Sequence, residues 1–219
     1  MGDSLTLTPI GVGAAYACPG EAQSAYLVAF GQTRVCLDLG AGALNRLQRH
    51  VAPETLTGIV ISHLHPDHCA DLFSLRIYMG WGPGRGSRIP VMAPAELPAR
   101  LMAFAGEDGW DGLEFAPLEG PAGVAQIGDL KLSWVEVPHS PPTFALRLDS
   151  PSGSVTYSAD CGPNDALVAL AAGTDVLVAE CGLGTGPSAA DAIHLSAHDA
   201  GSIARRAGAG QLVLVHCYP

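Results

Sequence analysis

The sequence predicts an α/β fold in which two β-sheets pack face to face and helices cover both outer faces. Short apolar runs alternate with amphipathic stretches along the chain, and much the same order of strands and helices occurs twice. With 219 residues, 48% of them hydrophobic, the chain can bury one substantial core. Because no linker separates the two halves, we expect residues 1–219 to form a single domain.

Each expected element has its own signal in the sequence. Strands are indicated by β-branched and aromatic runs bounded by turn residues, and helices by apolar residues that recur on one side. The expected strands are residues 5–10, 25–30, 35–39, 58–62, 89–92, 130–137, 144–148, 155–158, 176–180 and 212–216. The expected helices are residues 43–50, 67–78, 95–105, 164–172 and 197–207. The turn-rich segment 106–123 gives no clear signal for either.

Composition limits the classes of partner and location. The chain has 11 basic and 21 acidic residues, a formal charge of −10, and a single lysine, Lys131. A protein that grips long nucleic acid needs a basic surface, so we do not expect one here. No apolar run approaches the length of a membrane span, and residues 1–10 do not resemble a signal peptide. We therefore expect a cytoplasmic protein with a small-molecule substrate, while a homodimer remains open.

The densest chemical signal is a cluster of four metal-binding side chains within six residues. His63, His65, Asp67 and His68 follow the pattern H-x-H-x-D-H, between a buried strand and a helix. Imidazoles and a carboxylate at such a turn can converge on one cation. This donor set suits zinc or a similar first-row metal. A polar turn rich in histidine is the alternative, and the density of the cluster disfavours it.

Three further candidate ligands lie at the ends of expected strands. These are His139, Asp160 and His216. In a layered fold the strand ends form one rim, where sites gather. Taken singly, each residue is more typical of an ordinary turn, but the joint pattern with the histidine cluster indicates a metal site.

Six cysteines are present without a C-x-x-C pair, so we expect them to be reduced. Cys69, Cys161 and Cys217 each directly follow a candidate ligand. Because adjacent strand residues point to opposite faces, we expect these three side chains to face the core rather than bind metal.

The order of the candidate ligands resembles that of the metallo-β-lactamase superfamily, over essentially the whole chain. The resemblance implies an αββα sandwich of two mixed sheets, the metallo-β-lactamase fold, with a two-metal hydrolytic site at one rim. It implies two divalent metal ions, zinc by default, with manganese or iron as alternatives. The ligands carried over are, for the first metal, His63, His65 and His139; for the second, Asp67, His68 and His216; and, bridging both, Asp160.

Two further stretches are similar to the ribonuclease Z-like phosphodiesterases, a branch with small members that hydrolyse cyclic nucleotides. Residues 157–163, Y-S-A-D-C-G-P, look like that branch's Y-S-G-D-T-G-P, with Ala159 and Cys161 as departures. Glu180, followed by H-L-S at residues 194–196, is similar to the H-L-T-A motif, whose histidine lies near the leaving group. The tRNA-gripping arm of ribonuclease Z has no counterpart, because residues 79–90 form a short Gly-rich loop.

The residues and the resemblance together predict a dinuclear metal-dependent hydrolase, a phosphodiesterase acting on small anionic phosphodiesters such as cyclic nucleotides. Asp67 would hold a metal and orient the nucleophile. His194, flanked by Glu180, is the candidate proton donor to the leaving alkoxide. His194 could instead be a residue at a helix start capped by Ser196 and Asp199, a role compatible with proton donation.

Two other functions use the same residues. An ester, lactone or β-lactam hydrolase would share the metals but would favour an apolar acyl pocket and would need no histidine at position 194. A non-catalytic metal-binding protein is the second alternative.

Overall fold

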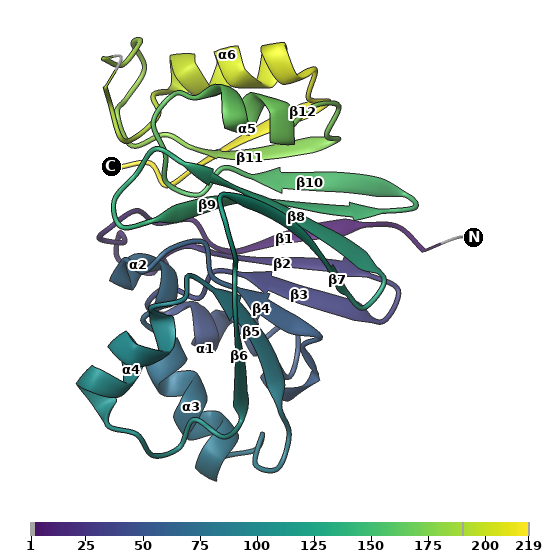
Figure 1. Cartoon of the computed structure of the whole chain (residues 1–219), viewed down its shortest axis with the longest axis vertical. Helices are drawn as coiled ribbons and strands as arrows, with labels where there is room; N and C mark the ends of the chain where they lie inside the picture. The colour runs from purple at the N-terminus through teal and green to yellow at the C-terminus, as the bar shows by residue number, and fades with distance from the viewer. Residues whose placement is uncertain (1–2, 190, 219) are drawn as a thin grey trace.

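Two six-stranded sheets form the centre of the protein in a computed structural model that describes residues 3–189 and 191–218 (Figure 1). The first sheet consists, in spatial order, of β1 (Thr6–Gly11), β2 (Ala25–Phe30), β3 (Thr33–Leu37), β4 (Gly58–Val60), β5 (Ile89–Ala93) and β6 (Leu113–Pro117). The second consists of β12 (Gln211–Val215), β11 (Val176–Glu180), β10 (Gly153–Tyr157), β9 (Thr143–Ser150), β8 (Leu130–Val137) and β7 (Ala122–Ile127).

Both sheets are mixed, as expected. In the first, β1, β2 and β3 pair antiparallel, and β3 to β6 pair parallel. In the second, β7 to β10 pair antiparallel, and β10, β11 and β12 pair parallel. Parallel strands end at the same edge, so side chains that follow β10, β11 and β12 gather at one rim.

Helices cover the outer face of each sheet, which confirms the predicted αββα sandwich. Four helices lie on the first sheet: α1 (Ala43–Leu47), α2 (Pro66–Cys69), α3 (Leu72–Trp81) and α4 (Leu97–Ala105), with a 3₁₀ turn at Pro53–Thr55. Two lie on the second: α5 (Asp165–Leu170) and α6 (Ala197–Ala207). Figure 1 shows these two sets below and above the paired sheets. In the described residues, no helix is long and apolar enough to span a membrane.

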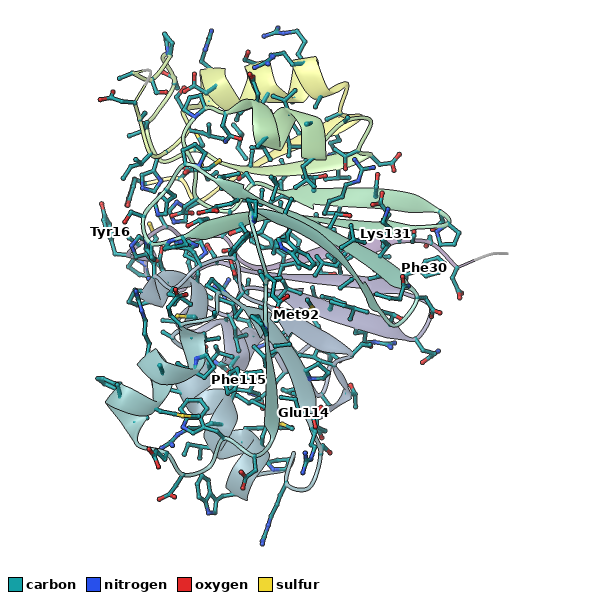
Figure 2. All side chains as sticks on the ribbon, in the orientation of Figure 1. Tyr16, Phe30, Met92, Glu114, Phe115 and Lys131 are labelled. Carbon is teal, nitrogen blue, oxygen red and sulfur yellow. The ribbon has the colours of Figure 1, made fainter. Side chains whose placement is uncertain are left out.

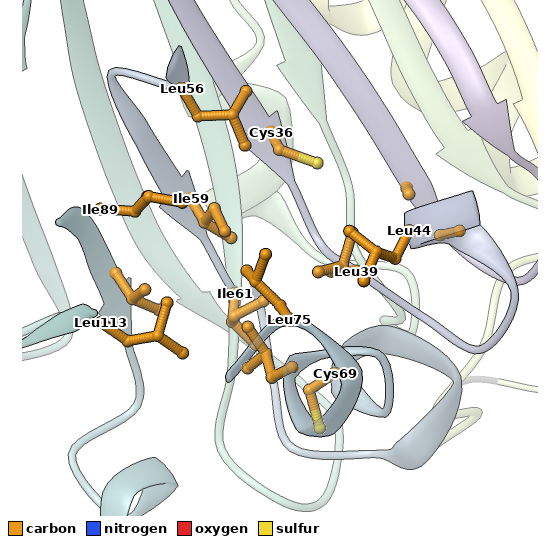
Figure 3. Packing of buried hydrophobic residues seen from close by; sticks show 14 of the residues in the cluster. Cys36, Leu39, Leu44, Leu56, Ile59, Ile61, Cys69, Leu75, Ile89 and Leu113 are labelled. Carbon is orange, nitrogen blue, oxygen red and sulfur yellow. The ribbon is translucent and has the colours of Figure 1, made fainter. Parts of the chain in front are cut away.

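The buried apolar residues form three clusters, one for each interface between layers. Leu75 of α3 packs on Ile59 and Ile61 under the first sheet (Figure 3). Tyr26 and Leu146 belong to the cluster between the sheets. The third cluster joins α5 and α6 to the second sheet. Strands covered on both faces lose the alternation of apolar and polar residues, which is why β4 is buried throughout.

One expected helix is in fact two. Residues 67–78 were expected to be continuous, but α2 ends at Cys69 and α3 begins at Leu72. The break occurs because the backbone of Leu39 forms hydrogen bonds with residues on both sides of it. Its N–H donates to the carbonyl of His68, and its carbonyl accepts the N–H of Asp71. The α3 helix then continues to Trp81, into the expected loop 79–90.

The unassigned segment 106–123 contains β6 and the first residues of β7. Both are the last strands of their sheets and largely exposed. Edge strands need little apolar character, so the usual strand pattern is weak in their sequences.

Candidate metal centre

The structure brings all seven candidate ligands to one rim of the sandwich. The loop after β4 and the short α2 provide four of them, and the chain beyond β8, β10 and β12 provides one each. The seven are His63, His65, Asp67, His68, His139, Asp160 and His216. They form two groups of four whose donor atoms lie within 4.8 Å of one another, and Asp160 belongs to both.

The first group consists of three histidines and Asp160. The Nδ1 atom of His65 lies 3.1 Å from Nε2 of His63 and 3.3 Å from Nε2 of His139. The Oδ2 atom of Asp160 lies 3.9 Å from Nε2 of His63. Three ring nitrogens and one carboxylate therefore face a common point, which is the donor pattern of a first-row metal site.

The second group consists of two histidines and two carboxylates. Nε2 of His216 lies 3.1 Å from Oδ2 of Asp67 and 3.4 Å from Oδ2 of Asp160, and Nε2 of His68 lies 3.3 Å from Oδ1 of Asp160. Within the described part of the chain, His68 Nε2 and Asp160 Oδ1 are buried without a hydrogen-bond partner. Buried polar atoms are normally paired, so these two are free to bind a divalent cation, and the residues fit one.

Electrostatics keep the carboxylates of this group ionised. Burial raises the pKa of Asp67, but the hydrogen bond to His216 and the charge of His68 outweigh it and hold the pKa well below the usual range. Burial likewise raises the pKa of Asp160, and the charge of His68 outweighs it, so the net shift is downward. At neutral pH both side chains are therefore anions, the form that binds a metal.

His68 shows the opposite balance. Burial lowers its pKa, yet the charges of Asp160 and Asp38 raise the pKa well above the ordinary value. A cation therefore suits this position, and a metal ion would take the place of the proton.

Asp38, which sequence analysis did not identify, orients His68. It lies directly after β3 and is fully buried. Its Oδ2 is 2.7 Å from Nδ1 of His68 and accepts hydrogen bonds from the hydroxyls of Tyr157 at 2.9 Å and Ser62 at 2.9 Å. Its Oδ1 accepts the N–H of Ser62 at 2.7 Å. A carboxylate at the end of an apolar strand, the signal that identified Asp160, was available for Asp38 as well.

Replacing Asp38 by asparagine is expected to weaken metal binding about 10–100-fold, because an amide cannot match the carboxylate as acceptor for His68. Titration against a chelator measures the affinity, and circular dichroism checks the fold. Asp175→Asn is the matched control, since Asp175 accepts two bonds from Ser154 at the opposite end of β10. Equal metal affinity in the Asp38 variant and the wild type would contradict the orienting role.

Three residues with a left-handed backbone adjoin the centre. In the described chain they are the non-glycine residues with positive φ: Asp38 at 58°, Ala159 at 52° and His216 at 54°. Each follows a strand directly or by one residue, where it turns the chain at the rim. Such conformations are strained for residues with a Cβ and concentrate at functional sites. At position 159 the resemblance has glycine, which adopts this conformation without strain.

Glu180 and His194 form a second structural unit at the rim. Glu180 Oε1 lies 2.8 Å from Nδ1 of His194 and accepts the N–H of Cys161 at 2.9 Å, while Oε2 accepts the N–H of Gly182 at 3.0 Å. The hydrogen bond to Glu180 raises the pKa of His194, against the effect of burial. Capping of α6 falls to Ser196 and Asp199, which form a capping box and leave the His194 ring free for the site.

A cavity of about 270 Å³ lies beside the candidate ligands and the Glu180–His194 pair. Its lining residues are Ala15, His65, Pro66, Asp67, Asp160, His194, His216 and Tyr218. Glu180 is not among them and is 1% exposed, so its carboxylate contacts His194 rather than the cavity. A larger cavity of about 630 Å³ near Trp81 contains none of the predicted site residues.

The cysteine predictions hold for two of three residues. Cys69 and Cys161 are buried, as expected, but Cys217 is exposed, so the prediction for it is wrong. The alternation of faces along a strand does not extend to Cys217, because β12 ends at Val215 and His216 turns the chain with its left-handed backbone.

Comparison with known proteins assigns the family. Residues 33–217 match the family described as the beta-lactamase superfamily domain. The chain belongs to the metallo-β-lactamase superfamily. This metallo-β-lactamase superfamily protein is 34% identical to protein Rv1339 of Mycobacterium tuberculosis, over 99% of the chain and 82% of the relative. It is 30% identical to ribonuclease Z of Mycobacterium bovis (strain BCG / Pasteur 1173P2), over 98% of the chain and 86% of the relative.

A solved structure agrees with the sequence relatives. The crystal structure of YhfI from Bacillus subtilis, which is named a probable metallo-hydrolase, matches with a TM-score of 0.87 and 26% identity. The match covers 98% of the chain and 86% of YhfI. This superfamily member is therefore a metal-dependent hydrolase of the ribonuclease Z-like group.

Proposed function

We propose that this protein is a dinuclear metal-dependent phosphodiesterase that hydrolyses small phosphodiesters such as cyclic nucleotides. The observation that carries the proposal is the Glu180–His194 pair beside the ligand cluster. The alkoxide released from a phosphodiester is a poor leaving group and requires a proton, which a positioned histidine supplies. The name of the relative ribonuclease Z supports the same bond type.

We assign the two groups of donor atoms to two metal ions. One group is His63, His65, His139 and Asp160, and the other is Asp67, His68, His216 and Asp160. When bound, the ions would activate water and neutralise charge on the phosphoryl oxygens. Zinc is the default, because imidazole and carboxylate suit it, and manganese or iron can use the same donors.

Three side chains are assigned different roles in the reaction. Asp67 lines the cavity and, besides holding metal, orients the attacking water. His194 presents its Nε2 edge to the cavity, since Nδ1 is held by Glu180, and donates the proton to the departing oxygen. Glu180 is a positioning residue, which fixes the ring and favours its protonated form.

The cavity favours a small substrate. Its volume is about 270 Å³, and no lysine or arginine is found among its described lining residues. A protein with a formal charge of −10 has little to attract a long phosphate backbone. We therefore expect long RNA to be a poor substrate, with turnover that depends weakly on salt.

A side-by-side screen of the metal-loaded protein tests the proposal. The substrates are bis-p-nitrophenyl phosphate, cyclic nucleotides, an acyl lactone and nitrocefin. We expect kcat/KM to be far higher for the phosphodiesters, because an acyl hydrolase has no use for the Glu180–His194 pair. Faster hydrolysis of the lactone or of nitrocefin would contradict the proposed phosphodiesterase activity. Metal binding without hydrolysis of any of these substrates would favour the non-catalytic alternative.

Metal content gives an independent prediction. We expect reconstituted protein to hold two ions per chain by elemental analysis, because seven donors exceed what one tetrahedral site uses. His63→Ala is expected to lower occupancy and abolish turnover while the apolar core keeps the fold. His198→Ala is the control, since that side chain is 57% exposed. A maximum of one ion per chain in the wild type would argue against the dinuclear assignment.

A further inference from the structure

Two exposed tyrosines meet beside the mouth of the cavity. Tyr16 is 62% exposed and Tyr218 is 41% exposed, yet their ring centroids lie 5.4 Å apart. Tyr218 lines the cavity and its ring centroid is 6.2 Å from that of His216, a member of the ligand cluster. Figure 2 shows Tyr16 on the left of the view, the side on which the C-terminal end lies in Figure 1. Large aromatic surface is thus open to solvent beside the candidate metal centre.

Hydrogen bonds of neighbouring residues fix the two segments that carry these tyrosines. The N–H of His216 donates to the carbonyl of Val12 at 2.9 Å, and Gly13 forms a bridge with Cys217. The side chain of Gln23 donates to the carbonyl of Ala15 at 2.8 Å, next to Tyr16. These contacts fix the backbone that carries the rings, so the protein has little loop freedom to lose when a ligand stacks on them.

We propose that Tyr16 and Tyr218 form a stacking platform for the planar base of a nucleotide-type phosphodiester whose phosphate lies at the candidate metal centre. The proposal rests on the proposed function and narrows its substrate class to phosphodiesters that carry an aromatic base. Stacking on an aromatic side chain tolerates any base, because every base has a π face. His216 is close to both parts of this arrangement: its ring centroid lies 6.2 Å from that of Tyr218, and its Nε2 lies 3.1 Å from Oδ2 of Asp67.

Two substrates with the same leaving group isolate the contribution of the base. Thymidine 5′-(p-nitrophenyl phosphate) carries a base, and methyl p-nitrophenyl phosphate does not. We expect wild type to prefer the thymidine ester, and Tyr218→Ala to lower kcat/KM on that ester by about tenfold with little change on the methyl ester. Tyr16→Ala is expected to act in the same direction. Equal losses on both esters would overturn the platform.

Further variants separate stacking from simple packing of the loop. Tyr218→Phe keeps the aromatic face and is expected to retain the preference, whereas Tyr218→Leu keeps apolar packing and is expected to lose it. Full preference in the leucine variant would overturn the proposal. Trp81→Ala is the matched control, because Trp81 is 61% exposed, much like Tyr16, but lines a different cavity.

Binding distinguishes failure of the platform from failure of the proposed function. Calorimetry compares thymidine 5′-monophosphate with deoxyribose 5-phosphate on the metal-loaded protein. The platform predicts tighter binding of the nucleotide, and loss of that difference in Tyr218→Ala. If neither ester is hydrolysed, the proposed function is wrong. The difference in binding affinity between the nucleotide and the sugar phosphate still tests the stacking platform in that case. Equal affinity of wild type for the two ligands would overturn it.

Discussion

Alanine in place of Asp67 is expected to reduce kcat/KM by several orders of magnitude on every phosphodiester. The substitution removes a proposed metal ligand, which is also the group that we assign to orient the attacking water. It also removes the acceptor that lies 3.1 Å from Nε2 of His216 and 3.4 Å from Nε2 of His68. Metal content, kcat and KM measured on the same preparation show the loss and its origin.

Asp67→Asn separates the two roles of that side chain. The amide keeps the volume of the carboxylate but not its charge, so metal content is expected to fall less than activity. Near-normal turnover by the alanine variant at full metal occupancy would be incompatible with the proposed role. Circular dichroism establishes that the fold is kept, which the apolar clusters on both sides of each sheet favour.

Alanine in place of His194 is expected to impair activity in a different way, because it removes only the proposed proton donor. Donors of this kind contribute roughly 10²–10⁴-fold. A cyclic nucleotide releases an alkoxide and should suffer the full loss, whereas bis-p-nitrophenyl phosphate releases p-nitrophenolate and hardly needs a proton. Metal content should stay unchanged. Equal losses on the two substrates would assign His194 to binding or positioning instead, and lost metal would place it among the ligands.

The pH dependence of activity provides a second test of the role proposed for His194. The hydrogen bond that His194 donates to Glu180 raises the pKa of His194, and a general acid is active only while protonated. Activity on a cyclic nucleotide should therefore persist above the ordinary histidine pKa of about 6.5 and fall at higher pH. Glu180→Gln removes the charge that stabilises the imidazolium, so the fall should move to lower pH. An unchanged alkaline limb in that variant would exclude the coupling.

The main strands and helices could be predicted because their apolar periodicity is strong. The expected strands 25–30, 130–137 and 176–180 and the helix 197–207 coincide with β2, β8, β11 and α6. The segments that failed lack that signal for a physical reason. β6 and β7 are exposed edge strands, and the break between α2 and α3 depends on Leu39, which is distant in sequence.

The candidate site, like the fold, could be predicted only in part. The seven candidate ligands could be found because their residue types and order carry the chemistry, and the structure places them together. Asp38 also offers a carboxylate at a strand end, but its role could not be assigned from the sequence, because it depends on contacts with Ser62, His68 and Tyr157 that only the folded chain creates. The proposed role of Glu180 also needed the fold, since it rests on the burial of Glu180 and on its hydrogen bond with His194.

The two sheets come from two continuous halves of the chain: strands β1 to β6 lie within residues 6–117, and β7 to β12 within residues 122–215. Residues 118–121 are thus the one covalent connection between the halves, and Glu119 and Gly120 in that connection are exposed. Both halves contribute donors to each candidate metal group. A chain cut at this point would remain associated through the inter-sheet core, and its fragments would bind each other more tightly as the free metal concentration rises, because only the associated form presents the complete donor set.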